Sequence, residues 1–224
     1  MHDASAVGQI IYALPSPVQK FYNIATLFRD VDWSDWQAVV NGFQKRFTEW
    51  YFARMAGGDS SYLDLCSLCA LVETFTHYTT ERHWHHPGNY KEFLRTLDPV
   101  FRKRLTPPIV VTRFEGRKWL QRKLMDYADV FYAGVRCSLH HHGDLASYTA
   151  MSGTGRIAVE FPNAGQSTCG RYSYTLVVFD PAPIKEALQI WLNRYCNDLR
   201  ANHTSMRAII FRRKFQRDFG ISIA

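Results

Sequence analysis

The stretch from Ser60 to Arg82, SSYLDLCSLCALVETFTHYTTER, constrains the fold of this chain more than any other. Its apolar residues recur every three to four positions, the spacing that places side chains on one face of an α-helix. This face is formed by Leu65, Leu68, Cys69, Val72 and Phe75. Ser60 or Ser61 can cap the start of the helix. A helix with such a face has to bury it against other elements, so we expect a helical core.

Helical spacing also marks much of the remaining chain. It predicts helices over residues 10–28, 32–58, 90–105 and 114–140, the second capped by Asp32 or Ser34. Gly57 and Gly58 are expected to end the second helix, and Gly143 to end the helix that begins at Phe114.

The pattern changes after Gly143. RIAVEF (156–161) and RYSYTLVVF (171–179) have the composition of strands and predict a β-hairpin. A final long helix is expected from Asp180, where an N-cap residue precedes two early prolines. The fold class is therefore mainly α, an up-and-down helical bundle with a small β-hairpin before the last long helix. No domain boundary is evident in the 224 residues.

Composition narrows the class of protein. Hydrophobic residues make up 46% of the chain, which is enough for a core and excludes a largely disordered chain. The net charge of +7 favours acidic partners such as nucleic acid. No apolar run is long enough to span a membrane, and the N-terminus has no signal-peptide pattern. Five cysteines without a scaffold-like spacing are typical of a reducing compartment, so we expect a cytoplasmic protein.

Two clusters have the residue types of a metal site. Cys66 and Cys69 are spaced like zinc ligands, but they lie on an apolar helix and no second pair completes four ligands. The other cluster is His83, His85 and His86, which has no acidic residue within it. The sequence favours core packing for the cysteines and a polar loop for the histidines.

Glu73 and Arg136 each interrupt an apolar helical pattern. Glu73 is either a carboxylate at the rim of the core or the partner of a buried cation. An arginine at position 136 is costly unless it is paired or faces a cleft. The two residues are therefore natural candidates for a contact with each other.

Three consecutive histidines, His140, His141 and His142, follow Arg136 just before Gly143. In a regular helix Arg136 and His140 share a face, and His141 lies roughly 140° further round. Unwinding of the last turn before Gly143 would instead bring His141 or His142 back toward Arg136. The histidines are equally consistent with cations that stabilise a helix C-terminus.

The segment YAGVRCSLHHHGD resembles the motif of HEPN-domain proteins, an arginine followed after four to six residues by a histidine at the end of a helix. Many bacterial members have a variant close to R-C-x-L-x-H-x-G, which Arg136, Cys137, Leu139, His141 and Gly143 match. His142 also lies within the permitted spacing. The likeness covers roughly residues 60–200, with Glu73 on the earlier helix that points at the site. We expect one HEPN-like domain over 1–224, with its core at 60–200, an N-terminal helical extension over 1–59 that the resemblance does not cover, and a basic C-terminal segment over 201–224.

The resemblance implies a metal-independent endoribonuclease without a cofactor, acting as a toxin or in anti-phage defence. It implies a homodimer in which the Arg–His pairs of two subunits line one cleft, and RNA and an antitoxin or another defence protein as partners. Arg136 and His141 would be catalytic, supported by Glu73, His140 and His142. Histidine is suited to proton transfer near neutral pH, and arginine to holding a phosphate. We expect loss of His140 to cost less activity than loss of His141.

Basic residues are dense between Arg102 and Lys123, and again toward the C-terminus from Arg207 to Arg217. We expect RNA to contact the first run through Arg117, Lys118, Arg122 and Lys123, although a solvated face explains the same charges. A non-catalytic HEPN-like binding module is the alternative function, and a zinc-dependent hydrolase that uses the histidine clusters is a second alternative.

Overall fold

The structure is a computed structural model that describes residues 31–55, 61–81, 86–115, 118–166, 173–219 and 223. It is mainly helical, with two small sheets. In chain order the elements are α2 (Trp36–Trp50), η2 (Phe52–Arg54), α3 (Ser61–Thr79), α4 (Pro87–Leu97), η3 (Pro99–Arg102), β1 (Arg104–Glu115), β2 (Lys118–Asp126), α5 (Tyr127–Val130), η4 (Phe131–Cys137), α6 (Ser138–His142), β3 (Thr149–Met151), β4 (Ala158–Gln166), β5 (Ser173–Phe179), α7 (Pro181–Ala201) and α8 (Met206–Phe219).

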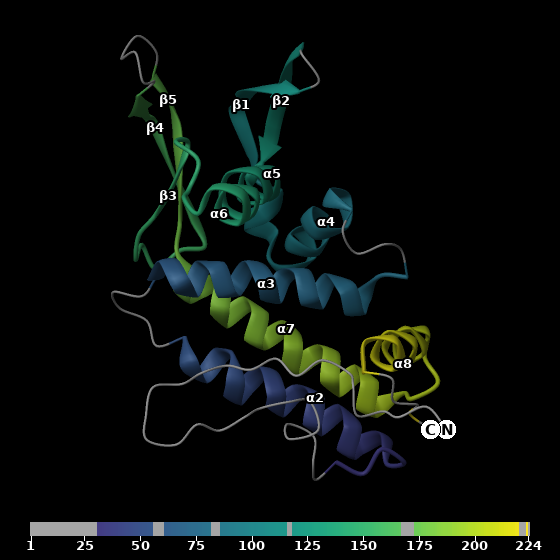
Figure 1. Cartoon of the computed structure of the whole chain (residues 1–224). Coiled ribbons are helices and arrows are strands. Elements are labelled where there is room, and N and C mark those ends of the chain that lie inside the picture. Colours follow the sequence, from purple (N-terminus) through teal and green to yellow (C-terminus); the bar gives the residue numbers. More distant parts are fainter. Residues whose placement is uncertain are drawn as a thin grey trace, which may run out of the picture.

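Helices α2, α3, α7 and α8 form the lower part of the molecule and enclose an aromatic core (Figure 1). The ring of Phe43 contacts those of Phe47 and Phe211, with centroids 4.9 and 5.0 Å apart. Phe75 of α3 stacks on Trp191 of α7 at 4.8 Å. All five residues predicted for the apolar face of α3 are buried, so that prediction is confirmed.

Strands β1 and β2 pair antiparallel, so the prediction of one helix over 114–140 was wrong for its first part. The strand pattern has period two. Ile109 and Leu124 face each other and are buried, while the neighbouring pair of Val110 and Lys123 is exposed. The β-branched run from Ile109 to Thr112 favours a strand. Only the part from Tyr127 onward is helical.

The hairpin predicted before the last long helix is present as β4 and β5. It is part of a larger unit, because β3 pairs in parallel with β5 and gives a three-stranded sheet in the order β3-β5-β4. The final long helix is α7, whose N-cap Asp180 accepts a hydrogen bond from the Ala182 N–H. Its early prolines lie in the first turn, as predicted.

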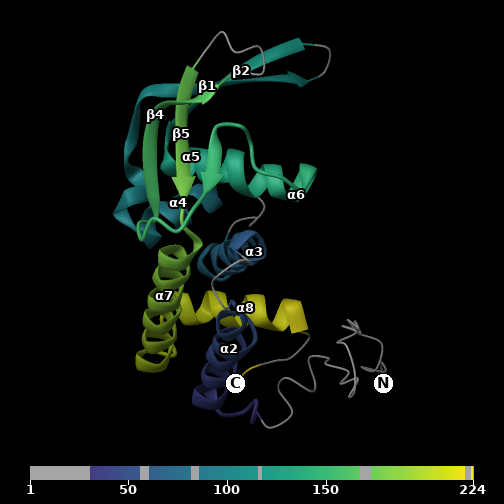
Figure 2. The same cartoon turned by 90° about the vertical axis from the view of Figure 1, so that its left-hand side faces the viewer.

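Both β-units rise from the same side of the helical layer, and the continuous helix formed by α5, η4 and α6 lies between them and α3 (Figure 1). Seen from the side, this helix runs from the rear of the molecule at α5 to the front at α6 (Figure 2). We refer to it as the motif helix, Tyr127–His142. Its C-terminal end is therefore exposed at the front.

Three predicted helix boundaries need correction. The helix expected over 90–105 begins earlier, at Pro87, and ends at Leu97, because Asp98 is extended before Pro99. The helix expected over 32–58 begins at Trp36, capped by Asp35, and ends at Trp50. The predicted helix over 10–28, Ser60, and the glycines at 57 and 58 lie outside the described residues.

Candidate functional site

Two ion pairs to α4 hold the start of the motif helix. Asp126 caps it by accepting a hydrogen bond from the Asp129 N–H, and Arg95 pairs with Asp126 at 2.9 Å. Lys91 pairs with the buried Asp129 at 2.7 Å. Burial alone would raise the pKa of Asp129, but hydrogen bonds from Lys91 and the Met125 N–H hold that pKa below its ordinary value. Asp129 is therefore charged at neutral pH and anchors the helix to α4.

The middle of the motif helix is π-helical, from Phe131 to Cys137. Wide turns of this kind are frequent at functional sites and leave backbone groups for other partners. The Gly134 carbonyl accepts bonds from the Ala146 N–H at 2.9 Å and the Thr149 hydroxyl at 3.0 Å. A Cβ at Gly134 would lie 2.5 Å from Thr149 Cγ2 and 2.6 Å from Tyr148 Cε2. Glycine is thus what lets the segment before β3 pack directly on the helix.

Arg136 extends from the π-helical segment toward α3. Its Nη2 donates a hydrogen bond to Glu73 Oε1 at 2.9 Å, and both side chains are mostly buried. Burial alone would lower the pKa of Arg136, but the Glu73 carboxylate raises it above its ordinary value, so the guanidinium stays charged. The guanidinium also lies 5.8 Å from the centre of the Tyr132 ring. The predicted contact between Glu73 and Arg136 is confirmed.

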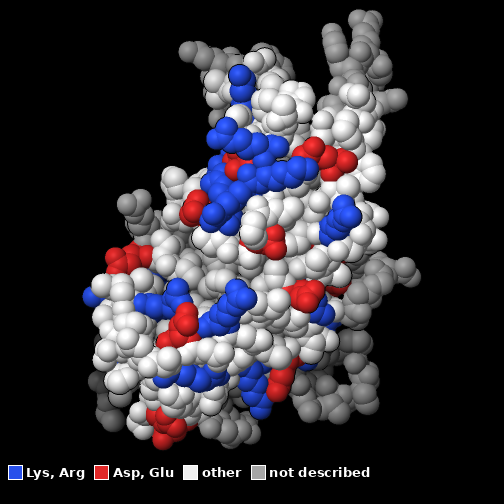
Figure 3. Space-filling model, turned by 180° about the vertical axis from the view of Figure 1, so that it is seen from behind, with Lys and Arg blue, Asp and Glu red and all other residues white. Residues whose placement is uncertain are grey.

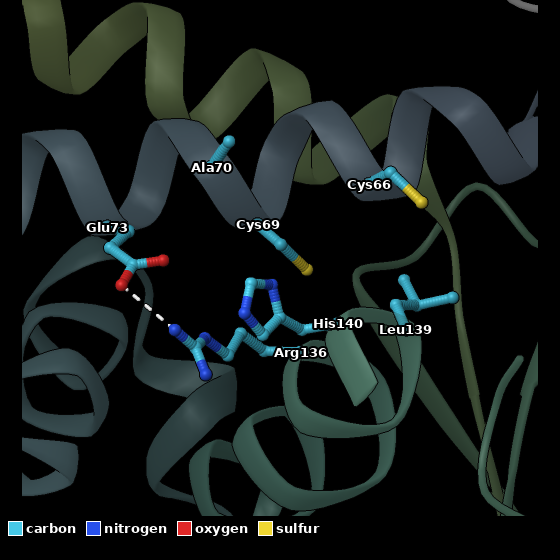
Figure 4. Close-up of a pocket in the computed structure, with 7 residues that line it drawn as sticks. All are labelled: Cys66, Cys69, Ala70, Glu73, Arg136, Leu139 and His140. Atoms are coloured by element: carbon cyan, nitrogen blue, oxygen red, sulfur yellow. Dashed lines mark hydrogen bonds and ion pairs between the residues drawn. The ribbon is translucent and has the colours of Figure 1, made fainter. Parts of the chain in front are cut away.

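A pocket of about 200 Å³ opens between α3 and the motif helix around this ion pair. Figure 4 shows Glu73 and Cys69 on α3 facing Arg136 and His140 across it. The residues that line it are Cys66, Cys69, Ala70, Glu73, Arg136, Leu139 and His140. The histidine in this pocket is therefore His140, the residue that regular helix geometry pairs with Arg136. His141 and His142 are exposed and are not among the lining residues.

The histidines occupy the last turn of the motif helix. Gly143 ends the helix in the left-handed conformation, at φ 70°, as the sequence predicted. Its N–H bonds to the Leu139 carbonyl at 3.1 Å, and its own carbonyl accepts a hydrogen bond from the Tyr62 hydroxyl of α3. Tyr62 thereby ties the histidine turn, His140–His142, to the helix that bears Glu73. Protonated histidines at this position would interact favourably with the helix dipole.

A buried tyrosine lies behind the ion pair. The Tyr90 hydroxyl of α4 is buried next to the Cys69 thiol, and the ring packs edge-on against Tyr132 at 5.3 Å. Burial and the neighbouring Cys69 hold the pKa of Tyr90 well above its usual value. Tyr90 therefore stays neutral and forms part of the support under Arg136. Tyr90 could not be recognised from the sequence, because nothing local distinguishes it from a core aromatic residue.

The cysteines of α3 are packing residues. Cys69 is buried in the core, and burial raises the pKa of its thiol to about 12. Cys66 is half-buried beside it and also lines the pocket. Across the described ranges, no three His, Cys, Asp or Glu residues are arranged to hold a metal ion. His83 and His85 lie outside those ranges, and His86 caps α4 by accepting a bond from the Gly88 N–H.

Three of the four residues expected to bind RNA lie on β2. Arg122 and Lys123 are exposed on β2, the side chain of Lys118 is not described, and Arg117 lies outside the described residues. Figure 3 shows Lys and Arg side chains gathered on the rear face, over α4 and the base of the hairpin. Exposed cations in this region include Arg102, Lys103 and Arg104. The histidine turn emerges on the opposite face (Figure 2).

Comparisons with known proteins give no relative for this arrangement. No protein-family model matches the chain, and neither a curated protein nor a solved structure is significantly similar to it. Among the described residues, no helix combines the length and the apolar character needed to cross a membrane.

Proposed function

We propose that this chain is a metal-independent endoribonuclease of the HEPN type, acting as a toxin or anti-phage effector in the cytoplasm. The observation that carries the proposal is the Arg136–Glu73 ion pair in a pocket one turn before three exposed histidines. An arginine held by a carboxylate is pre-oriented, and its remaining N–H groups can donate hydrogen bonds to a bound anion. A water molecule takes roughly 30 Å³, so a pocket of about 200 Å³ is of a size for a phosphate group.

In the proposed reaction the 2′-hydroxyl of the RNA attacks the adjacent phosphorus. A base removes the hydroxyl proton, the bond from phosphorus to the 5′-oxygen breaks, and an acid protonates that oxygen. Arg136 stabilises the charge that develops on the phosphate, and His141 is the acid or base. The products are a 2′,3′-cyclic phosphate and a 5′-hydroxyl.

The position of His141 supports a dimer within this proposal. Helical spacing places it roughly 140° from Arg136, on the solvent side of the last turn. One chain therefore offers Arg136 with His140 in the pocket, and His141 outside it. In a two-fold dimer, His141 of each subunit would contribute to a shared cleft, and the two histidines would serve the two proton transfers. His140, His142 and Glu73 would orient this set.

The test is cleavage of RNA by purified full-length protein, with and without a chelator. The proposal expects the same rate in both, products ending in a cyclic phosphate or its 3′-phosphate hydrolysis product, and intact DNA. Cleavage only after added zinc would favour the zinc hydrolase, and RNA binding without cleavage the non-catalytic module. Light scattering at micromolar concentration tests the assembly. A monomer with full activity would contradict the shared cleft.

A further inference from the structure

A second pocket, of about 450 Å³, lies between β1 and the segment before β3. We call it the β1 groove. It is lined by Pro107, Pro108, Ile109, Val110, Val111, Thr112, Ser147, Tyr148 and Thr175. Six consecutive residues of β1 line the groove. Because alternate side chains of a strand point to opposite faces, these six residues come from both faces of β1. The strand therefore presents its edge to the groove.

The edge of β1 that faces the groove has backbone N–H and carbonyl groups that can form hydrogen bonds with a ligand. β1 pairs with β2 along its other edge, and these two strands form a complete sheet among the described residues. From Ile109 to Thr112 the strand has peptide N–H and carbonyl groups, whereas Pro107 and Pro108 have no N–H. Opposite them lie the half-buried Tyr148 and Thr175 and the exposed Ser147. The groove thus combines an aromatic ring and aliphatic walls with hydrogen-bonding groups along its edges.

Arg122 adds a positive charge at this groove. It stands directly opposite Val111 in the hairpin, so both side chains lie on the same face of the sheet. Burial raises the pKa of Tyr148 to about 12, and the charge of Arg122 opposes that rise, which requires the guanidinium to be near the phenol. Arg122 is exposed and forms no ion pair with a described acid. Its neighbour Lys123 projects from the other face of the hairpin.

The groove is connected to the candidate catalytic site through the motif helix. Tyr148 and Thr149 pack on Gly134, two residues before Arg136. Residues 143–147 lead from the histidine turn directly to the groove wall. A short segment of the chain therefore joins the histidine turn to the wall of the groove.

We propose that the β1 groove is a nucleobase subsite, in which an unstacked base of single-stranded RNA lies against Tyr148 and the edge of β1 while Arg122 holds its phosphate. The inference rests on the proposed function and adds to it the class of substrate, a single strand with a splayed base. Flat aromatic surfaces and edge hydrogen bonds are how proteins hold unpaired bases. The groove has a volume within the range of roughly 300–1,000 Å³ that is usual for small-ligand sites.

The test measures binding separately from cleavage, with a fluorescent, uncleavable 2′-O-methyl oligonucleotide and full-length protein. Val111→Trp fills the groove from the same face of the hairpin as Arg122 and should weaken binding roughly 5- to 150-fold, the range expected when one base loses its stacking surface. Arg122→Ala should weaken it and reduce the salt dependence by about one phosphate contact. Lys45→Ala, at an exposed position of α2 away from the hairpin, is the control and should leave binding unchanged. An oligonucleotide with abasic positions should bind wild type and Val111→Trp alike.

Each outcome bears on one of the two proposals. If wild type cleaves RNA but Val111→Trp and Arg122→Ala bind like wild type, the subsite is refuted and the ribonuclease stands. If wild type binds through the groove without cleaving, the subsite stands and the ribonuclease is refuted. If wild type binds no oligonucleotide, both are refuted. If Val111→Trp changes only the oligomeric state, the groove is a contact between copies of the chain and the subsite is refuted.

Discussion

Arg136 and Glu73, 63 residues apart in the chain, form an ion pair of 2.9 Å that joins the motif helix to α3. Both side chains keep part of their surface exposed, and each fills a position where an apolar side chain would complete a helix face. The pair therefore orients Arg136 in the pocket in addition to joining the two helices. A bidentate contact with a phosphate requires a fixed orientation of the guanidinium, because two of its N–H groups must point at two phosphate oxygens.

The first prediction concerns the guanidinium. Arg136→Lys keeps the positive charge but loses the planar guanidinium, which can donate two hydrogen bonds to one phosphate. The rate of RNA cleavage should therefore fall by at least roughly 100-fold, the typical cost of losing one transition-state contact. Circular dichroism should show an unchanged fold. Glu73→Gln retains a hydrogen-bond acceptor and should cost less activity than Arg136→Lys. Wild-type activity in Arg136→Lys would show that Arg136 is structural only.

The second prediction concerns the basic hairpin. Replacing Arg117, Lys118, Arg122 and Lys123 together by Ala should flatten the dependence of RNA affinity on salt, because each phosphate contact contributes about 0.7 to the slope for single strands. The control is the double Ala variant of Arg213 and Lys45, which are exposed on α8 and α2, away from the hairpin. An unchanged slope in the fourfold variant would assign these cations to a solvated face.

The helical core and the Arg136–Glu73 contact could be predicted from the sequence, because both follow from local periodicity and from the cost of burying a charge. The hairpin at 104–126 could not. Trp119, Leu124 and Tyr127 have spacing compatible with a helix, and the pairing of Ile109 with Leu124 depends on a contact that periodicity does not reveal. The β1 groove could not be predicted for the same reason, since β1 and Tyr148 line one pocket only in the folded chain.

The third prediction concerns the close packing on the motif helix. Gly134→Ala places a methyl group within 2.5 Å of Thr149 and 2.6 Å of Tyr148, so the free energy of unfolding should fall by about 1–3 kcal/mol. Gly153→Ala is the control, because nothing lies within 4 Å of the position that its methyl group would occupy. Urea unfolding measures both variants. Equal stability of the two would refute the tight contact at Gly134.

The fourth prediction concerns His77, which is buried at the end of α3 and bonds to Asp218 of α8 at 2.9 Å. Burial lowers the pKa of His77, the charges of Lys214 and Arg217 lower it further, and Asp218 opposes them. The folded protein thus binds this proton less readily than the unfolded chain, whose pKa is 6.5. Stability should be greatest above that value and decline as pH falls through it.

Thermal unfolding of wild type and His77→Gln from pH 8 to pH 5 checks this. The wild-type melting temperature should fall below pH 6.5, and the variant should lose part of that dependence. An identical pH profile in both proteins would show that His77 does not contribute to the pH dependence of stability.

The central claim is that Arg136 and His141 cleave RNA without a metal, and the most direct measurement is the cleavage rate of His140→Ala, His141→Ala and His142→Ala in excess chelator. General acid–base catalysis is worth roughly 10²- to 10⁴-fold, so His141→Ala should lose visible cleavage while staying folded and dimeric. His140→Ala should retain more activity, although His140 is the histidine that lines the Arg136 pocket. Full activity in His141→Ala, or a greater loss in His140→Ala, would contradict the account and move the reaction into the pocket of a single chain.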